Sequence, residues 1–270
     1  MLEIRGASKT FHARTPNEVR ALQGLDLVIE DGQFLTVIGT NGSGKSTLLN
    51  AIAGTFYLDL GRILIGGCDV TRWAEHRRAS LIGRVFQNPF SGTAPGMSIA
   101  ENIALAAQRG RARGLGWALN GAIMSEIRDR VRTLNMGLED RLDNPIGTLS
   151  GGQRQALTLL MATWLKPQLL LLDEHTAALD PKTADQVIRL SEEIINREKL
   201  TTLMVTHSMA QAAHLGDRLI MMHRGRIIQD FKGAEKKRIR VVDLLESFEE
   251  VRRLEQLDES AAEMLSRSYV

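Results

Sequence analysis

The chain has 270 residues, of which 43% are hydrophobic and 24% are charged, and its formal net charge is +2. This length fits one large domain or two small ones, and the composition is ordinary for a globular protein with a normal core. A charge balance so close to neutral gives no sign of a nucleic-acid partner, and we expect none. The single cysteine, Cys68, excludes an internal disulfide framework and is typical of a reducing compartment. We expect it to be a partly buried small residue.

We expect neither a signal peptide nor a membrane-spanning helix in this chain. The N-terminal residues mix charged and apolar side chains and lack the apolar stretch of a secretory signal. No apolar run approaches the roughly 20 residues that a spanning helix needs, and the longest candidate, 169–172, has the length of a strand. Any role at a membrane is therefore expected to be that of a peripheral partner.

The first 53 residues predict strands followed by a helix. Strands are expected at Leu2–Phe11 and Val19–Ile29, with a turn at 12–18 that contains Pro16. A short β-rich run at 34–38 then leads into a glycine-rich loop, and a helical run at 46–53 follows.

The remainder predicts an α/β core that is interrupted by a helical subdomain at about 88–163. Within that subdomain, helices are expected at 100–107 and 122–134, with an exposed basic loop at 110–116. Strands and helices then alternate in the order strand 169–172, helix 182–197, strand 201–206, helix 209–215 and strand 218–223. Such alternation predicts a parallel sheet that is covered on both faces.

The last part of the chain, 233–270, is expected to be a charged helical extension of a domain at 1–232. Apolar residues recur there at three- and four-residue steps, from Leu244 and Phe248 to Met264. This spacing is typical of an amphipathic helix or helix pair. Docking onto the chain's own domain, dimerisation and contact with a partner remain open as roles for the apolar face.

The glycine-rich loop matches the pattern G-x-x-x-x-G-K-[ST] of triphosphate-binding loops. The predicted nucleotide-binding residues are Gly39, Thr40, Asn41, Gly42, Ser43, Gly44, Lys45, Ser46 and Thr47. Glycines let backbone N–H groups gather around phosphate oxygens, and the following helix directs its free N–H groups at the β-phosphate. Lys45 is expected to contact the β- and γ-phosphates, and the Ser46 hydroxyl to coordinate Mg²⁺.

Two carboxylates follow the apolar run at 169–172. In an open α/β sheet, ligands bind at the carboxyl ends of the strands, which is where Asp173 and Glu174 stand. Asp173 is placed to hold Mg²⁺ through water, and Glu174 to polarise the water that attacks the γ-phosphate. An Asp-Glu pair alone is a weak signal, but its place after the phosphate loop makes it a specific one.

The stretch Leu149-Ser150-Gly151-Gly152-Gln153 resembles the signature motif of the ABC superfamily of nucleotide-binding domains. Ser150 caps a helix whose first N–H groups, those of Gly151 and Gly152, form a second anion site. The resemblance covers about residues 2–232. It implies a P-loop NTPase core with a mainly parallel sheet, an N-terminal antiparallel β subdomain and an inserted helical subdomain.

The resemblance also implies roles for single residues. Gln87 is similar to the loop glutamine that contacts Mg²⁺ and water, and His207 to the switch histidine that contacts the γ-phosphate. Phe11 stands where the family places an aromatic ring against adenine, and the loop 178–180 where it crosses a dimer interface. The signature residues Ser150, Gly151, Gly152 and Gln153 would close on the ATP of a second chain, which implies a head-to-tail homodimer.

The function that the resemblance implies is an Mg²⁺-dependent ATPase that energises a membrane transporter through separate transmembrane permease subunits. The stretch 173–181 is similar to a subgroup of uptake systems with an extracytoplasmic substrate-binding protein, some of them for amino acids. The chain would then lie peripherally at the cytoplasmic face of the membrane. An exporter ATPase, or a soluble ABC ATPase for a scaffold or cell-division role, is the alternative. His175 departs from the family, where proline is commoner, and either tunes Glu174 or merely replaces a rigid residue.

Overall fold

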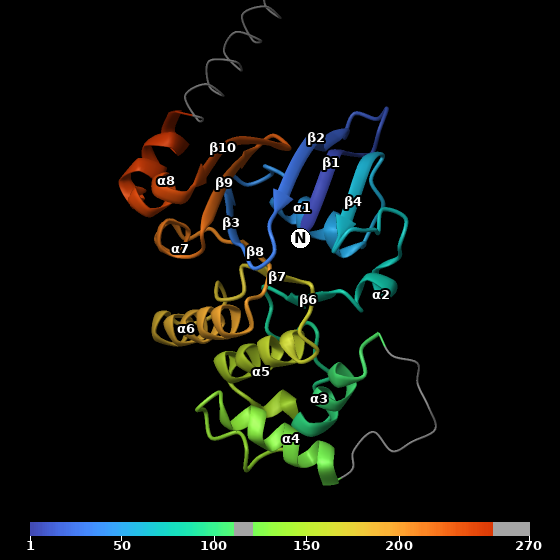
Figure 1. Cartoon of the computed structure of the whole chain (residues 1–270), viewed down its shortest axis with the longest axis vertical. Coiled ribbons are helices and arrows are strands. Elements are labelled where there is room, and N and C mark those ends of the chain that lie inside the picture. The colour runs from blue at the N-terminus through green and yellow to red at the C-terminus, as the bar shows by residue number, and fades with distance from the viewer. Residues whose placement is uncertain (111–120, 251–270) are drawn as a thin grey trace, which may run out of the picture.

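Two β-sheets form the upper part of the molecule in Figure 1, and the computed structural model describes residues 1–110 and 121–250. The first sheet is antiparallel, with four strands in the order β2-β1-β4-β5. Its strands are β1 (Leu2–Phe11), β2 (Val19–Ile29), β4 (Leu60–Ile65) and β5 (Cys68–Asp69). The predicted N-terminal antiparallel unit is therefore confirmed, and β1 and β2 have the predicted bounds.

The second sheet has six strands in the order β10-β9-β3-β8-β7-β6. They are β3 (Phe34–Gly39), β6 (Ile82–Val85), β7 (Leu169–Asp173), β8 (Thr202–Val205), β9 (Arg218–His223) and β10 (Arg226–Lys232). All neighbours pair in parallel except β10, which runs antiparallel to β9. Every residue of β3 and of β8 is buried, as expected for strands that are covered on both faces.

Alternating side chains of this sheet point into two different cores. On one face they meet α1 (Lys45–Ala53) and the antiparallel sheet, and on the other they meet α5 (Gly151–Thr163) and α6 (Pro181–Glu198). Leu169, Leu171, Leu203 and Val205 belong to the first core, and Leu170, Leu172 and Met204 to the second. The sheet therefore separates α1 from α5.

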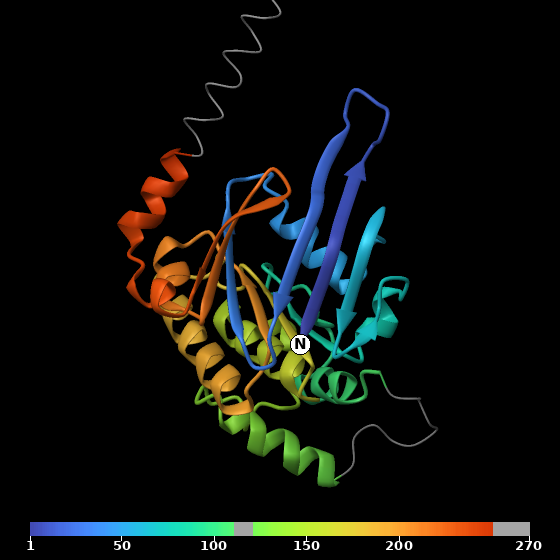
Figure 2. The ribbon, with the colours of Figure 1, turned by 45° about the horizontal axis from the view of Figure 1, so that its top comes forward.

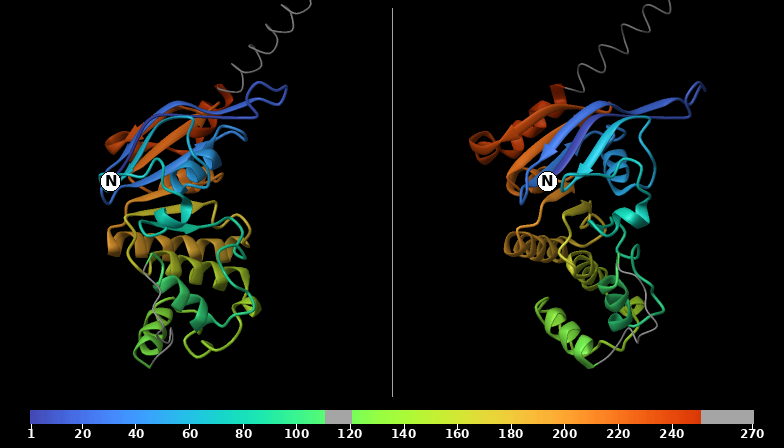
Figure 3. Two further views of the ribbon diagram at one scale, coloured as in Figure 1. Left: turned by 90° about the vertical axis from the view of Figure 1, so that its right-hand side faces the viewer. Right: turned by 45° about the vertical axis from the view of Figure 1, so that its right-hand side comes forward.

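The helical region lies at the lower end of the molecule (Figures 1 and 3). It contains α3 (Ile99–Ala107), α4 (Gly121–Arg132), the short 3₁₀ turn η1 (Ile146–Thr148) and the outer face of α5. These elements enclose an apolar cluster of their own, which includes Ile103, Ile127 and Leu157. Most of the loop predicted at 110–116 lies outside the described residues.

The C-terminal extension begins with α8 (Gly233–Arg238), and residues 241–250 are also helical. Figure 2 shows this segment alongside the end of the six-stranded sheet that carries β9 and β10. Leu244 is fully buried in a cluster with Ile38 and Ala212, the latter from α7 (Met209–His214), and the Lys236 ammonium donates to the Ala213 carbonyl at 2.7 Å. The described part of the extension thus packs on its own domain, and the amphipathic positions beyond 250 lie outside the described residues. Within the two described segments, no helix combines the length and apolar character that a membrane crossing requires.

The sequence analysis missed several short elements and misplaced the cysteine. It predicted no strand at β4, β6 or β10 and no helix at α2 (Glu75–Arg78). Cys68 is exposed rather than partly buried, because it lies in the two-residue edge strand β5 directly after the turn formed by Gly66 and Gly67.

Candidate functional site

The order of strands in the six-stranded sheet gathers the predicted site at one edge. Four consecutive neighbours, β3, β8, β7 and β6, run parallel, so their carboxyl ends meet at the same edge. The phosphate loop 39–46 follows β3, and His207 follows β8. Asp173 ends β7 and Glu174 follows it, and Gln87 stands two residues after β6.

The backbone of the phosphate loop is crowded at its first and third glycines. A Cβ atom at Gly39 would lie 2.3 Å from the carbonyl oxygen of Met222, and one at Gly44 would lie 2.4 Å from that of Ala21. Gly44 also has a φ of 101°, in the region that favours glycine. The loop can follow this path only because side chains are absent at these two positions.

Polar groups of the loop are held in a form suited to an anion. The hydroxyl oxygen of Ser43 is buried and has no hydrogen-bond partner within the described residues, so a phosphate oxygen would satisfy it. Lys45 donates from its buried ammonium to the carbonyls of Gly39 and Thr40, at 2.8 and 3.0 Å. Burial lowers the pKa of Lys45, and the carboxylates of Glu174 and Asp173 oppose this effect. A triphosphate fits both groups.

Glu174 connects the loops that follow β6 and β8. Its backbone lies in the left-handed region, with a φ of 45°, and its N–H donates to the Val205 carbonyl at 3.0 Å. One carboxylate oxygen lies 2.7 Å from Nε2 of His207, and the other accepts from Nε2 of Gln87 at 2.9 Å. The structure therefore brings together the three residues that the sequence analysis named as catalytic.

Asp173 has a neighbour that the sequence analysis missed. Nη2 of Arg84, on β6, lies 3.5 Å from Oδ2 of Asp173, and both side chains are largely buried. Burial raises the pKa of Asp173 above its ordinary value, and the charges of Arg84 and Lys45 act against this rise. An arginine inside an otherwise apolar strand, three residues before Gln87, was the signal in the sequence that could have identified it.

The three predicted Mg²⁺ ligands offer the oxygen atoms that this cation prefers. They are the hydroxyl of Ser46, the amide of Gln87 and the carboxylate of Asp173. Since the amide nitrogen of Gln87 donates to Glu174, its carbonyl oxygen is the atom that would face a cation. The described residues contain no cluster of three or more His, Cys, Asp or Glu side chains that could hold a metal ion. The three oxygen donors would suit Mg²⁺, which usually takes its remaining ligands from phosphate oxygens and water.

The signature residues lie apart from the phosphate loop of the same chain. Ser150 caps α5 by accepting from the N–H of Gln153 at 3.3 Å, and the Gln153 side chain accepts from the N–H of Ser150 at the same distance. Gly151 and Gly152 open the helix, and a Cβ at Gly152 would lie 2.0 Å from Cγ2 of Thr183 on α6. Because the sheet separates α5 from α1, the N–H groups at the start of α5 do not face the phosphate loop that precedes α1 in the same chain.

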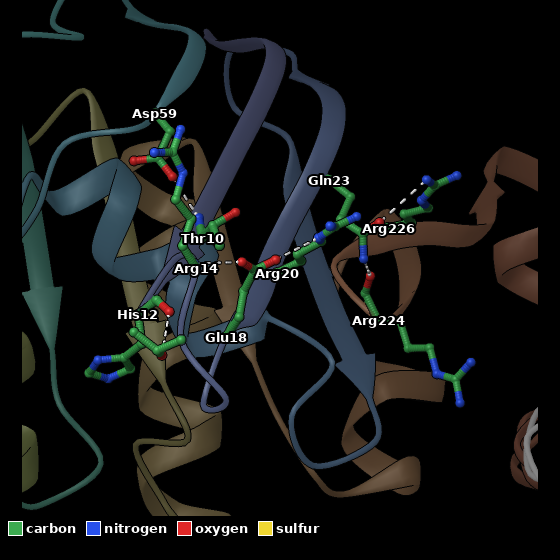
Figure 4. Close-up of polar contacts among 10 residues, drawn as sticks. Thr10, His12, Arg14, Glu18, Arg20, Gln23, Asp59, Arg224 and Arg226 are labelled. Carbon is green, nitrogen blue, oxygen red and sulfur yellow. Dashed lines mark hydrogen bonds and ion pairs between the residues drawn. The ribbon is translucent and has the colours of Figure 1, made fainter. Parts of the chain in front are cut away.

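Phe11, the predicted adenine contact, ends β1 beside a second aromatic ring. Its ring meets that of Phe56 edge to face, with centroids 5.3 Å apart. The Lys9 ammonium lies 5.6 and 5.5 Å from the two ring centroids and pairs with Asp59 at 2.8 Å. Thr10 also donates its N–H to Asp59, which fixes the end of the strand (Figure 4). No contact between Phe11 and the phosphate loop is among the interactions of the described residues, so its adenine role stays a prediction.

The hairpin after Phe11 is tied down by a few polar contacts (Figure 4). Glu18 accepts from the N–H of Arg14 and from the guanidinium of Arg20, at 2.9 and 3.1 Å. Gln23 reaches across to the turn between β9 and β10, where it donates to the Arg224 carbonyl at 2.9 Å. The antiparallel sheet is thereby joined to the turn that also borders Gly44.

His175, the departure from the family pattern, is buried and bonded to α6. Its Nε2 lies 3.0 Å from the hydroxyl of Ser191, and burial lowers its pKa to about 4. The ring is therefore neutral at physiological pH and cannot lend Glu174 a positive charge.

Two cavities adjoin this edge of the sheet. One, of about 630 Å³, lies between the core and the helical region and is lined in part by Arg84, Phe86, Asn102 and Arg109. The other, of about 590 Å³, lies between the phosphate loop, His207 and the C-terminal helix at Leu245 and Phe248. The first is called the groove below.

Comparisons with known proteins agree with this geometry. The family model described as ABC transporter matches residues 22–177. The tyrosine transport ATP-binding protein of Clostridioides difficile is 42% identical over 249 residues, which cover 92% of this chain and 99% of that protein. A lipoprotein-releasing system ATP-binding protein of Caulobacter vibrioides is 37% identical over 82% of this chain and 92% of that protein.

Solved structures show the same architecture. A dimeric post-hydrolysis structure of the ATP-binding cassette MJ0796, bound to ADP and Pi, matches with a TM-score of 0.73 at 26% identity and covers 86% of this chain and 98% of that one. The ADP conformation of MJ1267, an ATP-binding cassette of an ABC transporter, matches with a TM-score of 0.73 at 27% identity and covers 88% and 93%. The predicted α/β fold is confirmed.

Proposed function

This chain belongs to the ABC transporter family of ATP-binding subunits, and we propose that it hydrolyses ATP with Glu174 as the general base. The observation that carries this proposal is the bridge that Glu174 makes between Gln87 and His207, beside the phosphate loop. A carboxylate held by two donors is oriented, and orientation is what a base needs in order to act on one particular water.

The proposed reaction is an in-line attack of water on the γ-phosphate. The N–H groups of loop 39–46 and the ammonium of Lys45 bind the β- and γ-phosphates, and Ser43 donates its hydroxyl to a phosphate oxygen. Glu174 takes up the proton of the attacking water as the water oxygen bonds to the γ-phosphorus; the bond from that phosphorus to the bridging oxygen breaks, and ADP and phosphate are released. His207 contacts the γ-phosphate and, with Gln87, holds the carboxylate in line. Phe11 stacks on adenine.

Ser46, Gln87 and Asp173 are the residues that would hold Mg²⁺. When bound, this cation neutralises charge on the phosphate oxygens and so favours transfer to water.

We further propose that each complete site needs two chains in a head-to-tail dimer. The related cassette MJ0796 is dimeric in its post-hydrolysis structure. In this chain the sheet separates α1, which carries the phosphate loop, from α5, which carries Ser150 and the signature N–H groups. The phosphates of one chain would therefore bridge to the signature helix of the other, with loop 178–180 at the interface. Loss of the γ-phosphate then removes the charge that joins the two chains.

The transported solute is proposed to be amino-acid-like. A relative that this chain covers over 99% of its length is named for tyrosine transport, which supports an amino-acid-like solute, and we propose that the solute is imported. The groove beside Gln87 would receive the transmembrane permease, an extracytoplasmic binding protein would deliver the solute, and this chain would sit peripherally at the cytoplasmic face. Export is a second candidate, because the Caulobacter relative is named for lipoprotein release.

The test of the hydrolytic proposal is Glu174→Gln. This variant should bind ATP as the wild type does, lose nearly all turnover and accumulate as an ATP-bound dimer, as measured by size-exclusion chromatography with light scattering. Turnover near the wild-type rate would remove Glu174 from the role of base. Transport is tested separately, by identifying the membrane proteins that copurify with the full chain; a purely soluble partner would favour the non-transport alternative.

A further inference from the structure

Arg84 lies beside Asp173, the proposed metal ligand, and outside the sequence motifs that carry the rest of the site. It lies on β6, the edge strand of the six-stranded sheet, and its side chain is only 14% exposed. Arginine keeps its proton in proteins, so this side chain carries a full positive charge into a poorly hydrated place. No motif found in the sequence assigns it a role.

The guanidinium is fixed by the elements that carry the site. Nη2 donates to the side-chain oxygen of Asn50 on α1 at 2.7 Å and lies 3.5 Å from Oδ2 of Asp173 at the end of β7. Its Cζ stacks 4.6 Å from the ring centroid of Phe86, the residue before Gln87. Its Nε is buried without a partner in the described chain. The contact with Asp173 is therefore an ion pair at one nitrogen, not a two-pronged bond that would commit both carboxylate oxygens.

We propose that Arg84 is a positioning residue that acts as the counter-ion of Asp173 and weakens the affinity of the chain for the divalent cation of the nucleotide. The inference rests on the proposed role of Asp173 as a metal ligand. A fixed positive charge beside that carboxylate both repels a dication and competes for the same oxygen. It also holds the carboxylate in one place when no cation is bound.

The same side chain forms part of the wall of the groove. Arg84 therefore borders the groove on one side and Asp173 on the other.

The experiment measures metal binding, not turnover. The full chain is saturated with a non-hydrolysable ATP analogue and titrated with Mn²⁺, and the free Mn²⁺ is read by electron paramagnetic resonance. Arg84→Met, which keeps the length of the side chain and removes its charge, should bind Mn²⁺ about tenfold more tightly, the scale of the repulsion between a unit charge and a dication a few ångström apart in a well-screened site. Arg84→Lys keeps the charge and should restore an affinity close to that of the wild type.

Arg109→Met is the matched control. Arg109 lines the same cavity and is half-buried. Its guanidinium donates to the Ala162 carbonyl at 3.0 Å and pairs with no carboxylate in the described chain. This exchange should leave the affinity for Mn²⁺ unchanged. Binding of the analogue in EDTA should be equal in all variants, which shows that the fold is intact; Arg84→Gln replaces Arg84→Met if the latter does not fold.

Two results would overturn the proposal. The first is an unchanged or weaker affinity for Mn²⁺ in Arg84→Met. The second is an equal tightening in Arg84→Lys, which would show that the charge is not the cause. If the proposed function itself were wrong, other variants would show it. Lys45→Ala would then bind the analogue as the wild type does, and Asp173→Asn would bind Mn²⁺ as the wild type does.

Discussion

His175, the buried histidine that follows Asp173 and Glu174, makes the stability of the protein depend on pH. Nε2 of His175 lies 3.0 Å from the hydroxyl of Ser191, which donates to the Val187 carbonyl at 2.8 Å. The hydroxyl therefore accepts from His175, whose Nε2 carries the proton. Burial lowers the pKa of this ring from 6.5 to about 4. Below pH 6.5 the histidine binds a proton in the unfolded chain but not in the folded chain. The free energy of unfolding therefore decreases as the pH decreases.

The size of this effect follows from the two pKa values. At pH 7.5 the ring is neutral in both states and contributes almost nothing. At pH 5.0 the unfolded ring is charged and the folded ring is not, which lowers the free energy of unfolding by about 2 kcal/mol. The loss continues until the pH reaches the folded pKa.

The variant His175→Gln isolates this contribution. Glutamine offers an N–H donor near the position of Nε2 and does not titrate. We expect the loss of unfolding free energy between pH 7.5 and 5.0 to be about 2 kcal/mol smaller than in the wild type. This loss is measured by urea unfolding without nucleotide and with EDTA. Any cost of the substitution that does not depend on pH cancels when the two pH values are compared. An equal loss in both proteins would refute the reasoning, and His12→Gln, at an exposed histidine in the hairpin turn, is the control.

Three further predictions concern packing and the phosphate loop. Gly152→Ala places a methyl group 2.0 Å from Cγ2 of Thr183 and should lower the free energy of unfolding by about 1–3 kcal/mol, while Thr183→Ser, which removes that methyl, should restore most of it in urea unfolding. Leu244→Ala opens a cavity under the C-terminal helix and should weaken its docking by about 2 kcal/mol, seen as faster amide exchange at 241–250 with unchanged nucleotide binding. Lys45→Ala removes the charge that faces the phosphates and should weaken nucleotide binding by at least tenfold in equilibrium titration, and an unchanged affinity would disprove its role.

The elements with strong local patterns could be predicted from the sequence. β1 and β2 have the expected bounds, since alternation and a turn containing proline define them, and β7 was evident from four leucines in succession. β6 was missed because Ile-Gly-Arg-Val contains a glycine and a charge, which an edge strand tolerates but a pattern search rejects. The missed strand is the one that carries Arg84.

The arrangement of the site could not be read from local patterns. In the chain the relevant strands come in the order β3, β6, β7, β8, whereas in the sheet β8 lies between β3 and β7. Only that order brings His207, the second residue after β8, beside Glu174. Non-local pairing of parallel strands depends on how helices pack on both faces, which no window of sequence contains. The expectation that Gln87, Glu174 and His207 belong to one site came from the family resemblance and could not come from the strand patterns.

The backbone of Glu174 decides which variant tests the chemistry cleanly. Its left-handed φ of 45° costs a non-glycine residue roughly 1–3 kcal/mol. The N–H bond to Val205 and the two side-chain contacts, with His207 and Gln87, offset that cost and hold the carboxylate between the loops. Alanine would keep the strained backbone but release both contacts, and glycine would relax the backbone, so either exchange would mix lost chemistry with altered structure. Glutamine keeps the length and planar shape of the side chain and one of its two acceptor oxygens, and it removes the charge. It therefore disturbs the structure least, and a loss of turnover in Glu174→Gln with unchanged nucleotide affinity reports chiefly on the base.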